Sequence, residues 1–235
     1  MHENFAKIYD EFTKHVDYKA WYKFLRRYIK KKDKLLDIGC GTASLTSFFV
    51  QDGFCVTGLD ISQSMIDEAL KKVNIRYICQ DIEEKGLDEH FKYIICNFDT
   101  VNYFSSISKF ISNCSKMQKE GDILIFDVVL DGIFDEIFDE NGLFLDEESN
   151  YTAIWTHKKL KNKHRINIDM FIKIKDNVYE KYSEIHDKYI YEVDDIVNIL
   201  NENGYYLYDI GKNDKFGQSR LFIIAKKWVK LWKIN

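Results

Sequence analysis

The sequence predicts a doubly wound α/β fold, in which helices cover both faces of a mostly parallel sheet. Short apolar runs alternate with amphipathic helical segments from residue 34 to residue 128. The first apolar run enters a glycine-rich turn, and the second ends in an acidic residue. Such alternation indicates parallel strands joined by crossover helices. The chain has 235 residues, of which 46% are hydrophobic, which fits one medium domain or one domain with an insertion.

Two helices are expected before the first strand. Apolar residues at helical spacing, from Phe5 to Phe12, form one stripe, and Asp17 is placed to cap the second helix. Strands are then expected at 34–38, 54–59, 75–79, 93–97 and 122–128, and helices at 43–51, 63–72 and 107–117.

The alternation ends after Val129. A short acidic helix at 131–140 and extended segments at roughly 150–160, 164–175 and 178–190 predict an inserted antiparallel β meander. A helix at 193–203, which Gly204 ends, and strands at 205–210 and 220–226 complete the sheet. The predicted divisions are a helical flap at 1–32, a cofactor-binding domain at 33–130 and 191–235, and a helix with a β lid at 131–190.

Composition excludes several classes of function. A net charge of −4 argues against a general nucleic-acid binder, which carries a basic field. No apolar window is long enough to cross a bilayer, and the charged start lacks a signal core, so a cytoplasmic protein is expected. None of the five cysteines forms a Cys-x-x-Cys pair, so we expect reduced thiols and no metal site.

A glycine turn at residues 35–43, Leu-Leu-Asp-Ile-Gly-Cys-Gly-Thr-Ala, follows the first strand. This is the nucleotide-binding position of a doubly wound sheet. A dinucleotide fingerprint requires Gly or Ala where Ser44 stands, and Asp37 would repel a pyrophosphate. The same carboxylate attracts a ligand that carries an ammonium group. Asp60, at the end of the second strand, can accept hydrogen bonds from ribose hydroxyls in either cofactor class.

The Asp-x-Gly-x-Gly turn resembles motif I of the class I S-adenosylmethionine-dependent methyltransferases. Residues 60–69 resemble that family's Asp-hydrophobic-Ser-x-x-Met-hydrophobic-x-x-Ala pattern. The Cys-Gln-Asp-Ile segment at 79–82 resembles its adenine-binding segment, and residues 95–103 resemble the stretch that borders the transferring methyl group. The chain departs from the family at Ala43, where many members have a third glycine.

This resemblance implies the cofactor and its contacts. Asp60 would bind the ribose, Ile61 and Met65 would flank the adenine, and Asp81 with the Ile82 backbone would bind the adenine edge. Tyr9 would belong to a lid. The implied cofactor is S-adenosyl-L-methionine, and the implied binding residues are Tyr9, Asp37, Gly39, Cys40, Gly41, Asp60, Ile61, Met65, Asp81, Ile82 and Asn97.

The resemblance also extends outside the cofactor-binding segments. The N-terminal helices and the Glu-Ile-His segment at 184–186 resemble small-molecule methyltransferases of the sugar-amine and YqeM-like bacterial group. A Rossmann-like, seven-stranded sheet of order 3-2-1-4-5-7-6 is then implied, with its seventh strand antiparallel. Asp99 and His186 are the candidate catalytic bases, and Glu184 is placed to orient the histidine.

We therefore predict methyl transfer to a nitrogen or oxygen of a small molecule by in-line displacement. An RNA or protein methyltransferase and a non-catalytic S-adenosylmethionine-binding regulator stay open as alternatives, and so do a monomer and a homodimer. The absence of proline excludes the Asn/Asp-Pro-Pro-aromatic motif of adenine methyltransferases and the Pro-Cys nucleophile of many cytosine methyltransferases.

Overall fold

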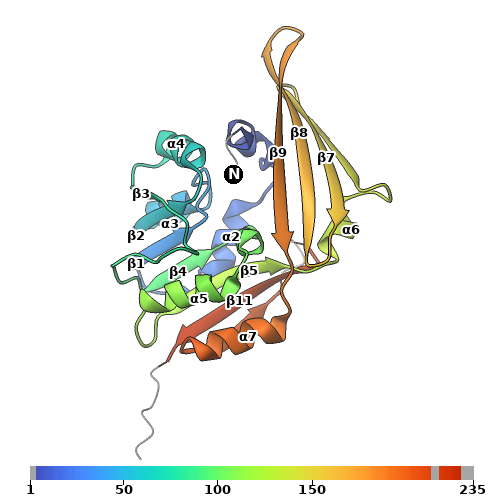
Figure 1. Ribbon diagram of the computed structural model, residues 1–235. Coiled ribbons are helices and arrows are strands. Elements are labelled where there is room, and N and C mark those ends of the chain that lie inside the picture. Colours follow the sequence, from blue (N-terminus) through green and yellow to red (C-terminus); the bar gives the residue numbers. More distant parts are fainter. Residues whose placement is uncertain (1–3, 213–216, 229–235) are drawn as a thin grey trace, which may run out of the picture.

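A computed structural model describes residues 4–212 and 217–228 of the chain (Figure 1). The main sheet contains β1 (Lys34–Ile38), β2 (Cys55–Asp60), β3 (Arg76–Cys79), β4 (Tyr93–Cys96), β5 (Ile123–Val129), β10 (Tyr205–Gly211) and β11 (Arg220–Lys227). Its seven strands lie in the order β10-β11-β5-β4-β1-β2-β3. Only β11 runs against its neighbours in this sheet, because it is antiparallel to both β5 and β10. The predicted strand order and the antiparallel seventh strand are confirmed.

Helices cover both faces of the main sheet. They are α2 (Tyr18–Leu25), α3 (Thr46–Gln51), α4 (Gln63–Lys72), α5 (Ile107–Lys116) and α7 (Val193–Glu202). Successive side chains of β5 point to opposite faces of the sheet. Leu124 and Phe126 pack in the core that contains α5 and α7, whereas Ile125 packs in the core that contains α2 and α3. This alternation is the period of a strand that is buried on both sides.

A second sheet rises beyond the end of β5 (Figure 1). It contains β6 (Leu143–Glu147), β7 (Tyr151–Lys159), β8 (Lys163–Lys175) and β9 (Val178–Tyr189), paired antiparallel in that order. The predicted meander is confirmed, but it has a further strand, β6. The sequence of this edge strand, Leu-Phe-Leu-Asp-Glu, does not alternate between apolar and polar residues, so it lacks the period-two pattern that identifies a half-buried strand.

The N-terminal segment and the second sheet share one apolar core. The segment contains η1 (Phe5–Lys7) and α1 (Tyr9–Phe12). Phe5 and Ile8 pack in the same cluster as Trp155 of β7 and Phe134 of α6 (Ile133–Ile137). We call residues 4–12, α6 and the β6–β9 sheet the roof. In contrast, α2 packs on the main sheet, so residues 4–32 belong to two packing environments. The division into flap, domain and lid stays a prediction.

The predicted helix caps are present, whereas some helices are shorter than predicted. Asp17 accepts a hydrogen bond from the Ala20 backbone, and Ser62 accepts one from the Met65 backbone. The helix α3 begins at Thr46 rather than at residue 43, because Ala43 has a φ of 64°, in the left-handed region that a helix cannot use. None of the helices within the described ranges has the length and apolar content that crossing a membrane requires.

Candidate functional site

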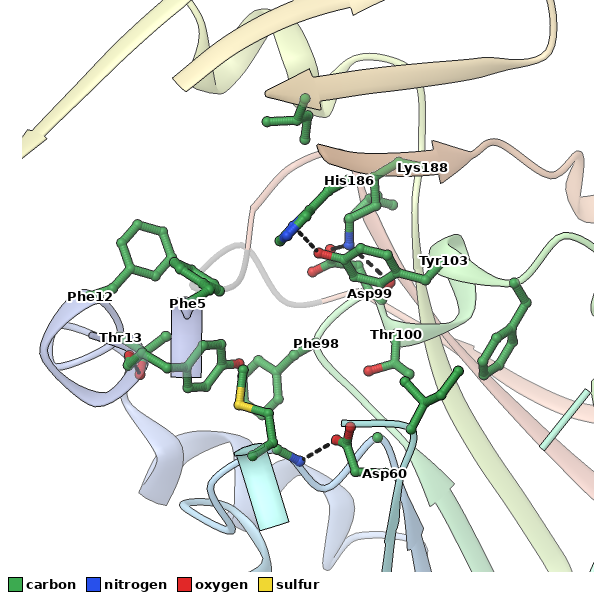
Figure 2. A pocket seen from close by; sticks show the side chains of 18 of the residues that line it. Phe5, Phe12, Thr13, Asp60, Phe98, Asp99, Thr100, Tyr103, His186 and Lys188 are labelled. Carbon is green, nitrogen blue, oxygen red and sulfur yellow. Dashed lines mark hydrogen bonds and ion pairs between the residues drawn. The ribbon is translucent and has the colours of Figure 1, made fainter. Parts of the chain in front are cut away.

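A cavity of about 490 Å³ lies between the carboxyl ends of the parallel strands and the roof (Figure 2). Its volume is in the usual range for small-ligand sites, about 300 to 1,000 Å³. A smaller pocket adjoins it at the glycine turn, and Tyr9, Gly39 and Gly41 line both. We call the part formed by the loops after β1, β2 and β3 the cofactor half. The part formed by η2 (Thr100–Tyr103), the ends of β5, β9 and β11, and the roof is the acceptor half.

The two glycines of the turn have different structural tasks. Gly39 and Gly41 have φ values of 68° and 53°, which favour glycine. A Cβ atom at Gly39 would lie 2.4 Å from Cγ2 of Thr100, so this glycine permits close packing of the turn on η2. A Cβ atom at Gly41 would meet only Tyr9, at 3.9 Å, so this glycine leaves a cradle open opposite the tyrosine ring.

Asp60 connects the turn after β1 to the turn after β2. Its Oδ2 accepts a hydrogen bond from the Gly41 backbone at 2.8 Å, and its Oδ1 accepts one from the Ser62 backbone at 2.9 Å. Burial raises the pKa of Asp60, although these N–H donors act in the opposite direction. Each carboxylate oxygen can accept more than one hydrogen bond, so Asp60 can still receive ligand hydroxyls at the cavity wall.

The smaller pocket presents one acid and one amide. Asp37 is buried and accepts a hydrogen bond from Thr46 Oγ1 at 2.6 Å, and burial raises its pKa to about 7. Asn97 Oδ1 accepts from Trp21 Nε1 at 3.0 Å, whereas Asn97 Nδ2 has no hydrogen-bond partner among the described residues. A buried acid beside an unpaired N–H donor fits a ligand end that carries both an ammonium and a carboxylate group.

The remaining predicted cofactor residues line the pockets as well. Met65 and Ile82 are buried in the wall of the large cavity, and Ile61 is exposed at its rim. Asp81 lines the same cavity and accepts a hydrogen bond from the Glu83 backbone at 2.7 Å, whereas Cys40 lines the smaller pocket. The structure therefore brings every predicted cofactor residue to one pocket or the other, and their individual contacts stay predictions.

Asp99 lies in a cluster of buried and half-buried charges in the acceptor half (Figure 2). Its carboxylate pairs with Lys188 and, at 3.1 Å, with Arg220, which also pairs with Asp127 of β5. Burial alone raises the pKa of Asp99, but the two cations outweigh burial and hold this pKa below its usual value. A carboxylate that two cations stabilise is a weak base, so this geometry favours a charge partner over a proton acceptor.

His186 has a carboxylate on one ring nitrogen and a phenol on the other. Its Nε2 lies 3.0 Å from Glu184 Oε2, and its Nδ1 lies 3.2 Å from the Tyr103 hydroxyl. Burial lowers the pKa of His186, while Glu184 acts to raise it. Glu184 Oε1 accepts hydrogen bonds from the backbones of Asn4 and Phe5, at 2.8 and 2.9 Å, so the same carboxylate fastens the N-terminal segment of the roof.

Sequence reasoning placed Tyr103 in the stretch that borders the transferring methyl group and matched Arg220 to a family segment, but it gave neither of them, nor Lys188 or Asp127, an individual role. One signal was available. Asp127 is a charged residue within the apolar run Ile-Leu-Ile-Phe-Asp-Val-Val, and a buried charge requires a partner. That the partner is Arg220 depends on the pairing of β5 with β11, which the sequence does not specify locally. Within the described ranges, no cluster of three or more His, Cys, Asp or Glu side chains is arranged to hold a metal ion.

The sheet order, the glycine cradle and the buried acids are those of the class I methyltransferase fold. The family model for the methyltransferase domain matches residues 35–121, which contain the segments around β1 to β4 that line the cofactor half. The chain has the class I methyltransferase fold, and its similarities support an S-adenosylmethionine-dependent methyltransferase with S-adenosylmethionine as cofactor.

Full-length similarity is to a bacterial group within this class. The methyltransferase-family protein YqeM of Bacillus subtilis (strain 168) is 29% identical, and the match covers 97% of each chain. An S-adenosylmethionine-dependent methyltransferase from Clostridium acetobutylicum is 25% identical with a TM-score of 0.84, and the match covers 97% of this chain and 99% of that one. The sugar N-methyltransferase KedS8 from Streptoalloteichus sp. has the same fold, with a TM-score of 0.77 at 18% identity, over 94% of this chain and 93% of its own.

Proposed function

We propose that the protein transfers the methyl group of S-adenosylmethionine to a nitrogen or oxygen of a small molecule that is enclosed beneath the roof. The observation that carries this proposal is one continuous cavity. It extends from Asp60 and Asp81 in the cofactor half to His186 and Arg220 in the acceptor half. A roofed cavity of this size admits a small acceptor and excludes most water, whereas a folded RNA or protein surface would require an open groove.

The residues of the cofactor half suit the parts of the cofactor. Asp60 would accept from the ribose hydroxyls, while Asp37 and Asn97 would hold the ammonium and carboxylate of the methionyl end. When bound, S-adenosylmethionine supplies an electrophilic methyl group on a sulfonium centre with a good leaving group. Most of the catalytic task of the protein is then to align the attacking atom with that methyl group.

The residues of the acceptor half would align and enclose the acceptor. Tyr9 lies across from Gly41 and faces both pockets, which places it between the cofactor site and the roof. The KedS8 protein, which has the same fold, acts on a sugar nitrogen, and this supports a small acceptor without identifying it. Free cysteines, three of them buried, fit a cytoplasmic location.

Cofactor binding provides the first test. Calorimetric titration of the full chain with S-adenosylmethionine and S-adenosylhomocysteine should show binding of both. Asp60→Ala should weaken both by about 100-fold, because it removes charge-assisted hydrogen bonds worth ~1.5 to 3 kcal/mol each. Asp169→Asn, a carboxylate on the far face of β8 that pairs with Lys181, is the matched control and should leave binding unchanged.

Acceptor class is tested by release of S-adenosylhomocysteine in the presence of small hydroxyl and amine compounds, total RNA and total protein. Release with small compounds alone supports the proposal. Release with RNA or protein alone contradicts it, and so does the absence of cofactor binding. Cofactor binding without transfer to any of these acceptors would favour a regulatory protein.

A further inference from the structure

His186 lines the cavity, but in this arrangement both of its ring nitrogens are engaged by protein groups. Only 1% of its surface is exposed, and both of its ring nitrogens already have neighbours: Glu184 on Nε2 and the Tyr103 hydroxyl on Nδ1. Tyr103 is half-buried, lines the cavity, and lies between His186 and the cofactor half (Figure 2). The Tyr103 hydroxyl is therefore the polar group that connects His186 Nδ1 to the cavity.

On the basis of the proposed function, we infer that the acceptor is a neutral hydroxyl compound and that Tyr103 relays its proton to His186. Tyr103 is then a catalytic residue, because its hydroxyl touches the acceptor oxygen. Glu184 is a positioning residue, which acts through the imidazole.

The transfer balances in atoms and charge. The acceptor oxygen gives its hydrogen to the Tyr103 oxygen as the new bond from oxygen to methyl carbon forms and the bond from that carbon to sulfur breaks. Tyr103 passes its own hydrogen to His186 Nδ1. The products are a methyl ether, S-adenosylhomocysteine and a protonated imidazole, which returns its proton to solvent after the roof opens.

The protonation states of the three residues suit a relay. Burial raises the pKa of Tyr103 well above its usual value, so the phenol keeps its proton and cannot serve as the final base. Burial lowers the pKa of His186, so the imidazole is neutral and can accept a proton. Glu184 stays ionised, because hydrogen bonds from His186, Phe5 and Asn4 outweigh its burial and lower its pKa to about 2. An ionised Glu184 accepts from Nε2–H, which leaves Nδ1 as the acceptor of the Tyr103 proton.

The charges around the acceptor half favour a neutral acceptor. Asp99 and Asp127 are paired with Lys188 and Arg220, so neither sign of charge is left in excess in this cluster. Glu184 is engaged by the imidazole and by two backbone N–H groups. An ammonium or carboxylate on the acceptor would therefore lose its water without gaining a charge partner.

The chemistry of the acceptor atom also favours a hydroxyl over an amine. An uncharged amine attacks with a free lone pair and releases its proton afterwards. A hydroxyl must lose its proton as the new bond forms, and a relay to a buried imidazole serves that need. Aromatic side chains, including Phe5, Phe12 and Trp155, form much of the remaining wall, so the body of the acceptor is expected to be apolar.

A binding experiment tests the acceptor class without turnover. The full chain, saturated with S-adenosylhomocysteine, is titrated with three probes of one skeleton: 2-naphthol, the 2-naphthylmethylammonium ion and 2-naphthoate. We expect 2-naphthol to bind at least ~10-fold more tightly than either ion, which is ~1.4 kcal/mol. Equal or tighter binding of an ion, or no binding of 2-naphthol, would overturn the acceptor class.

Nitrogen-15 NMR of the histidine rings tests the relay without any acceptor. Wild-type His186 should carry its hydrogen on Nε2 and titrate below its ordinary pKa, in the field of Glu184, Lys188 and the Tyr103 dipole. In Glu184→Gln the amide keeps an oxygen for Asn4 and Phe5 but presents N–H to the ring, so the hydrogen should move to Nδ1. An unchanged ring tautomer in this variant would contradict the positioning role.

Kinetics complete the test. With any hydroxyl acceptor that turns over, and with S-adenosylmethionine kept saturating at every pH so that Asp37 does not contribute, kcat/KM for the acceptor should fall on the acid side as His186 becomes protonated. Tyr103→Phe should lower kcat by roughly 10² to 10⁴-fold and remove that acid limb, because the base is disconnected. Tyr182→Phe is the matched control on β9, because its hydroxyl contacts Lys7 and Glu180 rather than His186.

The outcomes separate this inference from the proposed function. If the wild type binds no cofactor and transfers no methyl group, the proposed function fails. If the wild type transfers methyl groups while Tyr103→Phe keeps both the rate and the acid limb, only the relay is wrong.

Discussion

The two halves of the cavity are constructed in opposite ways. The cofactor half comes from consecutive loops at the ends of β1, β2 and β3, whose positions the central sheet fixes. The acceptor half combines residues that are far apart in the chain, such as Asp99 with Arg220 and Glu184 with Asn4. Local sequence can therefore specify the cofactor half, whereas the acceptor half forms only when the roof and the sheet have both folded. Substitutions should accordingly act differently in the two halves.

The largest expected effect is on the buried charges of the acceptor half. Arg220→Met should lower the free energy of unfolding by about 3 to 5 kcal/mol, because Asp127 and Asp99 would lose a buried counter-charge. Urea unfolding of the full chain measures this. The double variant Arg220→Met with Asp127→Asn should lose less of the free energy of unfolding than Arg220→Met alone, because it removes both partners of one ion pair. A loss below about 1 kcal/mol in the single variant would show that the cluster carries little of the stability.

A smaller effect distinguishes the two glycines of the cofactor half. Gly39→Ala should cost about 2 to 3 kcal/mol of stability, because its Cβ atom collides with Thr100 and the backbone is left-handed. Gly41→Ala should cost only about 1 kcal/mol, since its Cβ atom enters open space. It should instead weaken S-adenosylmethionine binding by roughly 10-fold, ~1.4 kcal/mol. Equal stability losses and equal affinities in the two variants would contradict this division of tasks.

Asp37 makes the affinity of the cofactor half depend on pH. Its pKa in the free protein is raised to about 7 by burial, and the cofactor ammonium favours the ionised form. Affinity for S-adenosylmethionine should therefore be constant above that pKa and fall by up to tenfold per pH unit below it. Calorimetry from about pH 8 to about pH 6 measures this. Asp37→Asn should bind weakly at every pH.

The same substitution should stabilise the unliganded fold. The pKa of Asp37 is higher in the folded state than in the unfolded state. The free energy of unfolding therefore decreases as the pH rises from the unfolded-state pKa to the folded-state pKa. At about pH 8, Asp37→Asn should raise the free energy of unfolding by on the order of 2 kcal/mol while cofactor binding is lost. A pH-independent affinity in the wild type, or a destabilised variant, would show that Asp37 is not the titrating group.

The smallest effect is expected at the outer margin of the roof. Lys14 pairs with Glu148 at 2.5 Å, but half of the Lys14 side chain is exposed. Water and salt screen such a pair, so Glu148→Gln should leave the unfolding midpoint and the cofactor affinity unchanged within error. If Glu148→Gln lowers the unfolding midpoint or the cofactor affinity and the decrease persists at high salt, this ion pair contributes more than expected to holding the N-terminal segment on the roof.

The sequence predicted the main sheet and the cofactor half because their signals are local. Each short motif lies directly after one strand, and the parallel order of the strands brings those ends together. Asp37, Asp60 and Asp81 illustrate this, since each belongs to a contiguous pattern.

The acceptor half was predicted only in part. His186 was identified beside Glu184, but its second partner, Tyr103, lies 83 residues earlier and is brought to it by the packing of η2 on β9. The strand β6 was missed, because an edge strand with one weakly covered face has little apolar periodicity. Pairings across such distances depend on which sheets pack together, and residue spacing does not encode that.

The contact between Glu184 and the N-terminal segment has a consequence for the order in which the chain assembles. Asn4 and Glu184 are 180 residues apart, so this contact closes a long loop. Closing a long loop has an entropic cost that must be met before its contacts reward it. The pairs β1–β2 and β1–β4, which frame the glycine turn, join residues that are closer in the chain and should form earlier. We therefore expect the cofactor half to form early in folding. The acceptor half, in which Glu184 positions His186, should form later.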